Sequence, residues 1–164
     1  MPLGRLKNQK NASRGHSSAG QYLKKILPYA NILQEVSYKD LMKLAYKKSR
    51  TAPELQNIFL MNSSSHMRAD WVIPDLDLVI EINGEQHFEA VRFGGISQDE
   101  AEHRLLAQSF LDKKKKLCVK EIGWKLFEYR VLHNQEFLYA DFKKSLNGFL
   151  HSKNRMIEKN DEKK

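Results

Sequence analysis

The chain has 164 residues and a formal net charge of +8, and hydrophobic residues make up 41% of it. These values are typical of one globular domain with an apolar core, and no apolar run approaches the length that crosses a bilayer. The lone cysteine, Cys118, excludes an intramolecular disulfide and any zinc site built from several cysteines. Because no signal-like segment stands at the start, we expect an intracellular, reducing location.

The first part of the chain carries only basic charges, since no acidic residue occurs before Glu35. Residues 1–17 combine these charges with Gly, Asn and Ser and have no apolar period. We expect them to form a flexible basic arm that binds the phosphates of nucleic acid, although a solubilising tail has the same composition. The candidate phosphate-binding residues of this part are Arg5, Lys7, Lys10, Arg14 and Lys24.

Three elements are expected before the middle of the chain. A helix begins at a cap formed by Ser17 or Ser18, and residues 31–36 form a short strand. Residues 38–65 are predicted to be a helical insertion that begins with an amphipathic basic helix. Its lysines make the insertion a candidate DNA-contacting surface, and a helix face that is merely solvated is the alternative.

Residues 68–88, which read RADWVIPDLDLVIEINGEQHF, are the most informative part of the sequence. Two short apolar runs flank a Pro-Asp pair, which is typical of a turn, so the runs are predicted to pair as antiparallel strands. Asp70 begins the first strand and Glu81 ends the second. The hairpin therefore returns both carboxylates to the same end.

A histidine is expected to join these two carboxylates, because the Asn-Gly pair after the second strand allows a sharp turn that brings His87 back. Two carboxylates suit Mg²⁺, or Mn²⁺ in its place, and an imidazole suits the activation of water. We therefore predict a phosphodiesterase centre in which Asp70 and Glu81 hold the metal. Each residue also has an ordinary structural explanation, but a carboxylate that ends an apolar run is costly unless a metal or a donor satisfies it.

A long helix is predicted from the capping box at residues 97–100 to about Glu121. Asp112 is expected at the border of its apolar face, from where it reaches the centre, or else as an ordinary partner of Lys116. The apolar face is assigned to Leu106, Phe110 and Leu117. The lysines that either grip phosphates or simply coat the helix include Lys113, Lys115 and Lys116. A strand over 124–130 and an amphipathic helix over 134–150 follow.

The hairpin sequence, together with RFGG at 92–95 and FLDKKK at 110–115, resembles the phage-type, Vsr-like nucleases. These EDxHD enzymes are a branch of the PD-(D/E)XK superfamily that includes very short patch repair endonucleases and some phage homing endonucleases. The resemblance implies that Asp70 and Asp112 are the invariant acids and that Glu81 stands at the second carboxylate position. Asn83 replaces the usual lysine of the superfamily, and the resemblance implies that His87 takes over its catalytic duty.

One residue departs from the family pattern. The first acid normally follows the local pattern SxGE, but this chain has Gln21 at that position. Either the amide of Gln21 suffices, a nearby acid such as Glu35 substitutes for it, or the chain is a weakened or inactivated nuclease.

The order of elements and the resemblance together imply an α/β, or α+β, restriction-endonuclease-like fold with a mixed sheet and flanking helices. Residues 18–150 would form a single nuclease domain, and residues 151–164 a charged C-terminal tail. The expected function is that of a DNA endonuclease of homing or nicking type from a phage or mobile element, acting in the host cytoplasm if a phage encodes it. A DNA-binding module with weakened catalysis and a ribonuclease with the same centre are the alternatives. The sequence leaves open whether the protein is a monomer or a homodimer.

Overall fold

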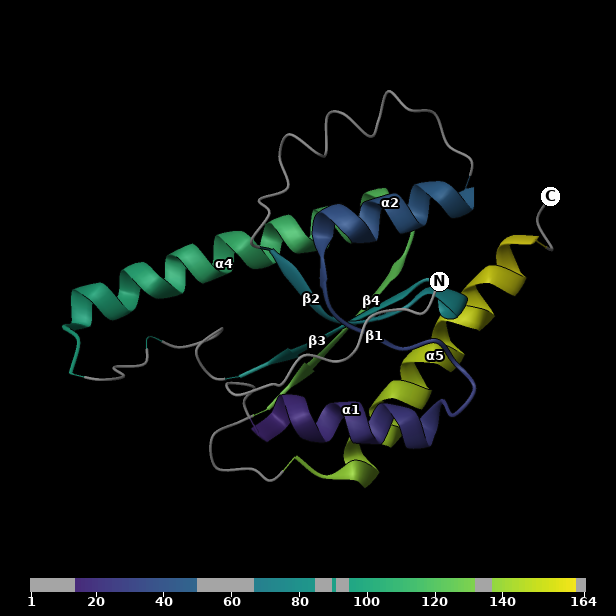
Figure 1. The fold of residues 1–164 in the computed structure, drawn as a ribbon, viewed down its shortest axis with the longest axis horizontal. Helices are drawn as coiled ribbons and strands as arrows, with labels where there is room; N and C mark the ends of the chain where they lie inside the picture. Colours follow the sequence, from purple (N-terminus) through teal and green to yellow (C-terminus); the bar gives the residue numbers. More distant parts are fainter. Residues whose placement is uncertain (1–13, 50–66, 85–89, 91–94, 132–136, 162–164) are drawn as a thin grey trace, which may run out of the picture.

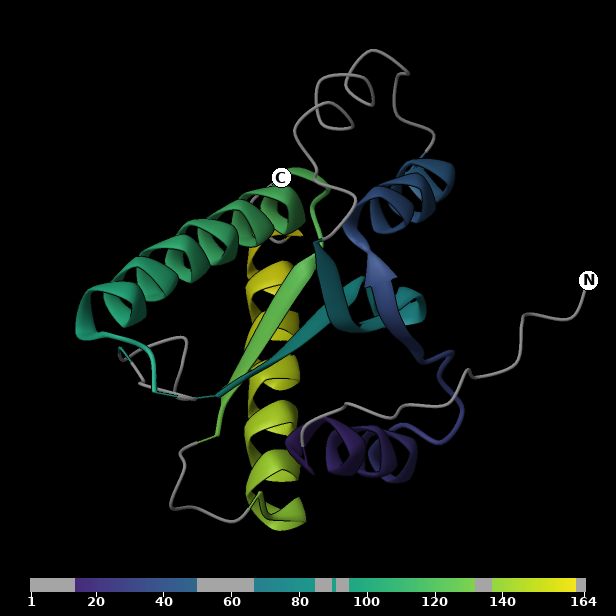
Figure 2. The same ribbon diagram turned by 60° about the vertical axis from the view of Figure 1, so that its left-hand side comes forward.

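The computed structural model describes residues 14–49, 67–84, 90, 95–131 and 137–161, without the side chains of 14–17, 49 and 153–161. A four-stranded mixed sheet lies between two layers of helices (Figure 1). Helices α2 (Tyr38–Ser49) and α4 (Gln98–Glu121) cover one face. Helices α1 (Arg14–Ile26) and α5 (Tyr139–Asp161) cover the other (Figure 2). The predicted mixed α/β architecture is confirmed.

The predicted hairpin is formed by β2 (Arg68–Ile73) and β3 (Leu78–Asn83). The strands pair antiparallel, with Trp71 opposite Ile80. The turn is a short 3-10 helix that begins at Pro74, and Asp77 closes it in the left-handed region with a φ of 49°. The prediction succeeded because it rested on local signals, namely two β-forming runs and a proline whose fixed φ suits a turn.

Two outer strands complete the sheet, whose order is β1-β2-β3-β4. Strand β1 (Leu33–Ser37) pairs antiparallel with β2. Strand β4 (Lys125–Arg130) pairs parallel with β3, and the register places Glu128 beside Glu81. Helix α4 makes the crossover that a parallel pair needs and so lies across the sheet face near these residues. It begins at the predicted cap, where the Ser97 hydroxyl accepts a hydrogen bond from the Glu100 amide.

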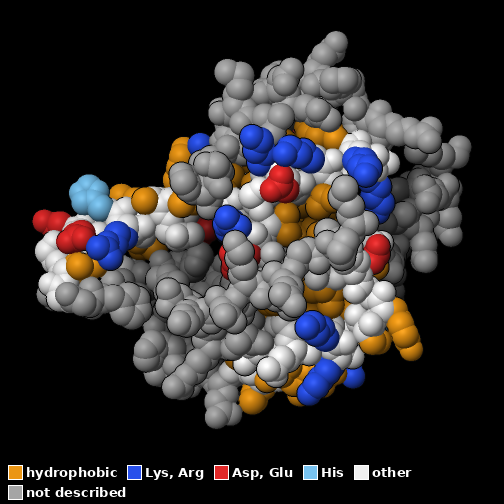
Figure 3. Space-filling model, viewed as in Figure 1, with side chains coloured by type: hydrophobic (Ala, Val, Ile, Leu, Met, Phe, Trp, Pro, Cys, Tyr) orange, Lys and Arg blue, Asp and Glu red, His pale blue; other side chains and the backbone are white. Residues whose placement is uncertain are grey.

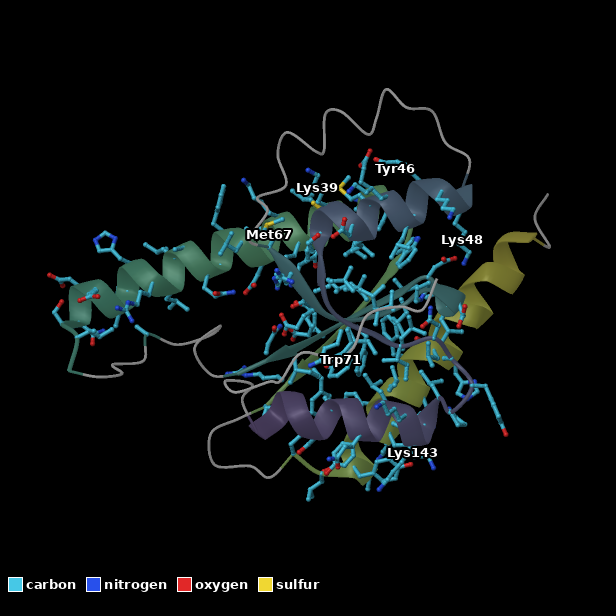
Figure 4. All side chains as sticks on the ribbon, in the orientation of Figure 1. Lys39, Tyr46, Lys48, Met67, Trp71 and Lys143 are labelled. Carbon is cyan, nitrogen blue, oxygen red and sulfur yellow. The ribbon has the colours of Figure 1, made fainter. Side chains whose placement is uncertain are left out.

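Each face of the sheet has its own apolar core. The core under α1 and α5 is aromatic and includes Trp71, Phe127 and Phe142, which are all buried. Helix α1 approaches the sheet closely there, because a Cβ at Gly20 would lie 2.5 Å from the Trp71 indole. Figure 4 shows Trp71 between the sheet and α1. The core under α2 and α4 is smaller and includes Tyr38.

Two helix boundaries differ from those predicted. Helix α1 begins at Arg14, so Ser17 and Ser18 lie inside it rather than at its cap. Serine in a helix interior is only mildly unfavourable, and packing of the following turns outweighs it. Helix α5, which was expected over 134–150, begins at Tyr139 and continues to Asp161. Its last turns contain no Gly or Pro and are rich in residues that favour helices.

Some predicted features fall outside the described residues. These are most of the basic arm, the part of the insertion beyond residue 49, and His87. The described start of the insertion, α2, packs on the sheet through the buried side chains of Tyr38 and Leu41. Among the helices that are described, none combines the length and the apolar character needed to cross a membrane.

Candidate functional site

The alternation of side chains along β3 separates an apolar face from a partly polar one. Leu78 and Ile80 belong to the core under α1 and α5, whereas Val79 belongs to the core under α2 and α4. Successive side chains of a strand point to opposite faces, so Glu81 and Asn83 lie on the α2 and α4 face. Within the described part of the chain these two are the buried polar or charged residues, with exposed fractions of 4% and 7%.

Three elements meet at the Glu81 carboxylate. The Tyr38 hydroxyl, from α2, donates a hydrogen bond to Glu81 Oε1 over 3.1 Å. The Lys115 ammonium, from α4, forms an ion pair with Glu81 Oε2 at 2.7 Å, and only 14% and 6% of the two side chains are exposed. The same ammonium lies 5.9 Å from the centre of the Tyr38 ring. Both carboxylate oxygens of Glu81 therefore have a donor.

Burial shifts the titration of this group. Loss of hydration raises the pKa of Glu81 to about 7, and the nearby negative charge of Asp70 adds to the increase, while the Lys115 ammonium opposes it. Burial also raises the pKa of Tyr38, with the charge of Glu81 as a further cause, so the Tyr38 hydroxyl keeps its proton. A carboxyl group that titrates near neutrality is common in functional sites, although structural ion pairs also perturb pKa values.

Asp70 lies beside Glu81 on the neighbouring strand. The pairing of Trp71 with Ile80 places Asp70 opposite Glu81 at the next position along the hairpin. Asp70 Oδ2 accepts a hydrogen bond of 2.7 Å from the Ile82 amide. The two carboxylates thus lie at the same end of the hairpin, which is the juxtaposition that the sequence predicted.

Helix α4 presents a polar segment to this end of the sheet. Its least exposed side chains recur every three or four residues, and Gln108, Asp112 and Lys115 belong to this stripe. The stripe is completed by Ala101, Leu105 and Val119. The Gln108 amide donates a hydrogen bond of 2.8 Å to Asp112 Oδ1. Asp112 therefore shares the helix face that carries Lys115 to Glu81.

The apolar face that the sequence predicted for α4 is wrong. Leu106, Phe110 and Leu117 are exposed, with fractions of 68%, 59% and 63%. Apolar residues occur around the whole helix, so their periodicity does not fix its rotation. The rotation of α4 is fixed by the packing of Cys118 and Val119 against the sheet, which turns the stripe with Gln108, Asp112 and Lys115 inward.

A second polar cluster, which the sequence analysis missed, adjoins the first. The Lys116 ammonium pairs with Glu128 Oε2 at 3.0 Å, rather than with Asp112 as the alternative prediction had it. The Asn83 amide lies 3.4 Å from Glu128 Oε1. Consecutive lysines of α4 therefore contact carboxylates on neighbouring strands. The alternation of side chains along β4 predicts which of its residues share a face with Glu128. The parallel register with β3, which places Glu128 beside Glu81, cannot be read from the sequence.

The other predicted catalytic residues have different surroundings. Gln21 is exposed on α1, the helix that packs on the opposite face of the sheet from Glu81. Glu35, the alternative acid, falls opposite Asp70 in the register of β1 and β2, and its φ of 52° interrupts the regular strand. His87 lies outside the described residues.

The predicted phosphate-binding residues do not share one environment. Lys24 and Lys113 are exposed, Lys115 is turned inward to Glu81, and Lys116 is paired with Glu128. Arg5, Lys7 and Lys10 lie outside the described residues, and the side chain of Arg14 is not described. Figure 3 shows further basic side chains gathered over α2, with an acidic one between them. Figure 4 places Lys39 and Lys48 on this helix.

The residues at the polar face suit one divalent cation. Mg²⁺ in proteins is commonly held by one or two carboxylates, with water completing its coordination, and Asp70 and Glu81 provide this set. The Lys115 ammonium lies against Glu81, so positive charge is accommodated beside this carboxylate. Among the residues that the structure describes, no group of three or more His, Cys, Asp and Glu side chains is arranged to hold a metal.

Comparisons of the chain with models of protein families, with curated proteins and with solved structures find no match. The geometry of the polar sheet face and the sequence motifs are therefore the observations from which a function is inferred.

Proposed function

We propose that this chain is a metal-dependent DNA endonuclease that hydrolyses phosphodiester bonds. The observation that carries the proposal is the position of Asp70 and Glu81 on neighbouring strands, with the cationic Lys115 against Glu81. Two carboxylates beside each other at a largely buried site are costly, and a cation between them removes that cost. The resemblance to the Vsr-like nucleases supports the same function and suggests a homing or nicking enzyme of a phage or mobile element.

The side chains have separate roles in the proposed reaction. Asp70 and Glu81 hold Mg²⁺, which when bound stabilises the negative charge that develops on the phosphate. By the resemblance, His87 accepts the proton of the attacking water. Asp112 orients His87 from the inward face of α4.

DNA is the proposed substrate because the chain has a net charge of +8. Exposed lysines such as Lys24 and Lys113 supply positive charge on the described surface. Lysine and arginine that neutralise phosphates bind nucleic acid without reading its sequence, so we expect affinity to fall steeply with salt. The basic arm, residues 1–17, adds further positive charge.

The test is incubation of supercoiled plasmid with the protein in Mg²⁺, Mn²⁺ or EDTA. We expect relaxation or linearisation that requires the metal and is lost in Asp70→Ala and His87→Ala. Asp99→Ala removes an exposed carboxylate from the first turn of α4 and serves as the matched control with full activity. Gln21→Glu introduces the acid of the family pattern on the opposite face of the sheet from Glu81, so no change in activity is expected. Metal-independent cleavage, or cleavage that survives in Asp70→Ala, would contradict the proposal.

One observation favours a second candidate, a DNA-binding module with weakened catalysis. Both Glu81 oxygens already have donors, Tyr38 and Lys115, which is also the arrangement of a purely structural buried pair. In that case the protein binds DNA, Asp70→Ala binds equally well, and neither cleaves in any metal. A ribonuclease with the same centre is distinguished by running the assay on RNA of matched length.

A further inference from the structure

Helix α4 carries an apolar stripe on the side that does not face the sheet. This outer stripe consists of Leu106, Phe110 and Leu117, which are all more than half exposed. Their spacing of four and seven residues places the three side chains within about 40° of one another around the helix axis. Neither apolar core in the described part of the chain includes them. Single exposed apolar side chains are ordinary, but several on one stripe form the kind of patch that marks an interaction surface.

The charges beside the outer stripe are segregated along α4. Asp99 and Glu102 lie in its first turns, whereas Lys113 and Lys114 lie in its second half. All four fall within about 60° of the centre of the stripe around the helix axis. The Gln98 amide donates a hydrogen bond of 2.9 Å to Glu102 Oε1, and this neutral donor does not cancel the negative charge. The outer stripe is therefore acidic at one end and basic at the other.

This pattern complements itself when two copies of α4 lie antiparallel. A two-fold axis through the middle of the helix would bring Leu106 of one copy against Phe110 of the second, and the reverse contact follows by symmetry. The same axis would bring Glu102 of one copy close to Lys114 of the second. In one copy the Lys114 ammonium lies 5.0 Å from the centre of the Phe110 ring, so this charge already borders the apolar contact. A parallel arrangement would instead bring like charges together, which disfavours it.

A second copy matches the outer stripe better than nucleic acid does. Phosphates attract the lysines of the stripe, but they are repelled by its acidic end and gain little from its leucines and phenylalanine. Figure 1 shows α4 extending beyond the sheet at its N-terminal end, which gives a second helix access to it. The helix has 24 residues and is about 36 Å long and about 10 Å wide, so its footprint is smaller than a standard interface. We therefore expect a dimer of moderate affinity, with a Kd in the micromolar range.

We propose that two copies of this chain form a symmetric dimer through α4, with the helices antiparallel. The interface buries Leu106 and Phe110 at its centre and Leu117 toward its ends, and each acidic end of α4 faces the basic end of the second copy. The inference concerns the assembly of the chain and does not rest on the proposed nuclease activity.

The first experiment measures the mass of the full chain by sedimentation velocity, without nucleic acid, from about 1 μM to about 1 mM. The wild-type mass should rise with concentration from that of one chain to that of two. Phe110→Glu places a carboxylate at the centre of the interface and should stay monomeric throughout. Tyr29→Glu is the matched control, because Tyr29 is an aromatic residue outside α4 that is 99% exposed, and this variant should dimerise as wild type does. Circular dichroism checks that all three proteins are folded.

The second experiment tests the antiparallel orientation by charge reversal. Glu102→Lys places a lysine beside Lys114 of the second copy and should weaken the dimer about tenfold or more. Combining Glu102→Lys with Lys114→Glu restores opposite charges across the interface, so the Kd should return to within about threefold of wild type. Sedimentation velocity at low salt gives both values.

Three results would overturn the inference. They are a wild-type chain that stays monomeric over the whole range, a dimer that survives Phe110→Glu, and a double variant that binds no more tightly than Glu102→Lys alone. A monomeric wild type that loses nucleic-acid binding in Phe110→Glu would assign the outer stripe to nucleic acid instead. Failure of plasmid cleavage would contradict the proposed nuclease and leave the dimer standing.

Discussion

The two faces of the sheet are built from the same central strands but have opposite characters. Under α1 and α5 the side chains are apolar and aromatic, with Phe142 fully buried among rings of other elements. Under α2 and α4 the buried side chains are apolar except near the end of β3, where Glu81 and Asn83 are polar. Strand alternation thus allows one set of residues to stabilise the fold while the other set carries charge.

The polar face gains little stability from its charges. Replacing a buried ion pair by apolar residues of similar volume is often neutral or stabilising, so stability alone does not account for Glu81 and Lys115. The aromatic face, by contrast, gains directly from burial. The aromatic face therefore stabilises the fold, and the polar face is the one to which the proposed function assigns the chemistry.

The largest expected effect on stability comes from the aromatic face. Phe142→Ala removes a fully buried ring and should lower the free energy of unfolding by about 3–5 kcal/mol. Urea denaturation followed by circular dichroism measures this change. The titration of Glu81, observed by NMR at pH values where the variant is folded, should stay as in wild type. A shifted Glu81 pKa would mean that the two faces are not independent.

A neighbouring pair of lysine variants compares buried and exposed charge on the polar face. Lys115→Met leaves the buried Glu81 without its cation and should cost about 2–3 kcal/mol, because protonation of Glu81 limits the penalty. Lys116→Met breaks an exposed pair and should cost less than about 1 kcal/mol. Both are measured by urea denaturation at neutral pH. Equal costs would contradict the burial that distinguishes the two pairs.

The raised pKa of Glu81 predicts how stability depends on pH. The folded-state pKa is about 7 and the ordinary value is 4.5, so between these pH values the folded state retains a proton that the unfolded chain has lost. The Glu81 contribution is therefore fully present below about pH 4.5 and declines as pH rises to about 7, by on the order of 3 kcal/mol.

Glu81→Gln tests this dependence, because a glutamine side chain does not titrate. Compared by urea denaturation at pH 5 and pH 8, the variant should gain stability relative to wild type at the higher pH. A difference between the two proteins that does not change with pH would show that Glu81 has an ordinary pKa.

The smallest of these effects concerns the contact that holds α1 to the aromatic face. Gly20→Ala places a Cβ 2.5 Å from the Trp71 ring, and the overpacking should outweigh the better helix propensity, for a net cost of about 1 kcal/mol. Gly148→Ala is the matched control, because no atom lies within 4 Å of its Cβ and it should stabilise α5 by up to about 1 kcal/mol. Thermal unfolding gives both values, and opposite signs are expected.

Local signals explain what could be predicted from sequence. The turn at Pro74 and the cap at Ser97 each depend on a few adjacent residues, and both were placed correctly. The position of Asp70 and Glu81 at the same end of the hairpin followed from the antiparallel pairing alone.

Long-range packing explains what could not. Lys115 and Glu81 are 34 residues apart, and their contact requires both the parallel register of β4 and the rotation of α4. The rotation of α4 was mispredicted because its exposed side carries large apolar residues, Leu106, Phe110 and Leu117. These residues give a stronger apolar pattern than the buried Cys118 and Val119. Tyr38 was overlooked because it begins a basic helix, where a tyrosine gives no sign of lying beneath a carboxylate.

The most direct test of the division between the two faces is the rate of phosphodiester cleavage by folded protein for one variant on each face. Glu81→Gln and Phe142→Leu are compared with wild type in Mg²⁺, under conditions where circular dichroism shows all three to be folded. We expect Phe142→Leu to cleave at nearly the wild-type rate and Glu81→Gln to be slower by about a hundredfold or more. Equal rates in the two variants, or a wild-type protein without activity on any DNA or RNA substrate, would contradict a catalytic role for the polar face.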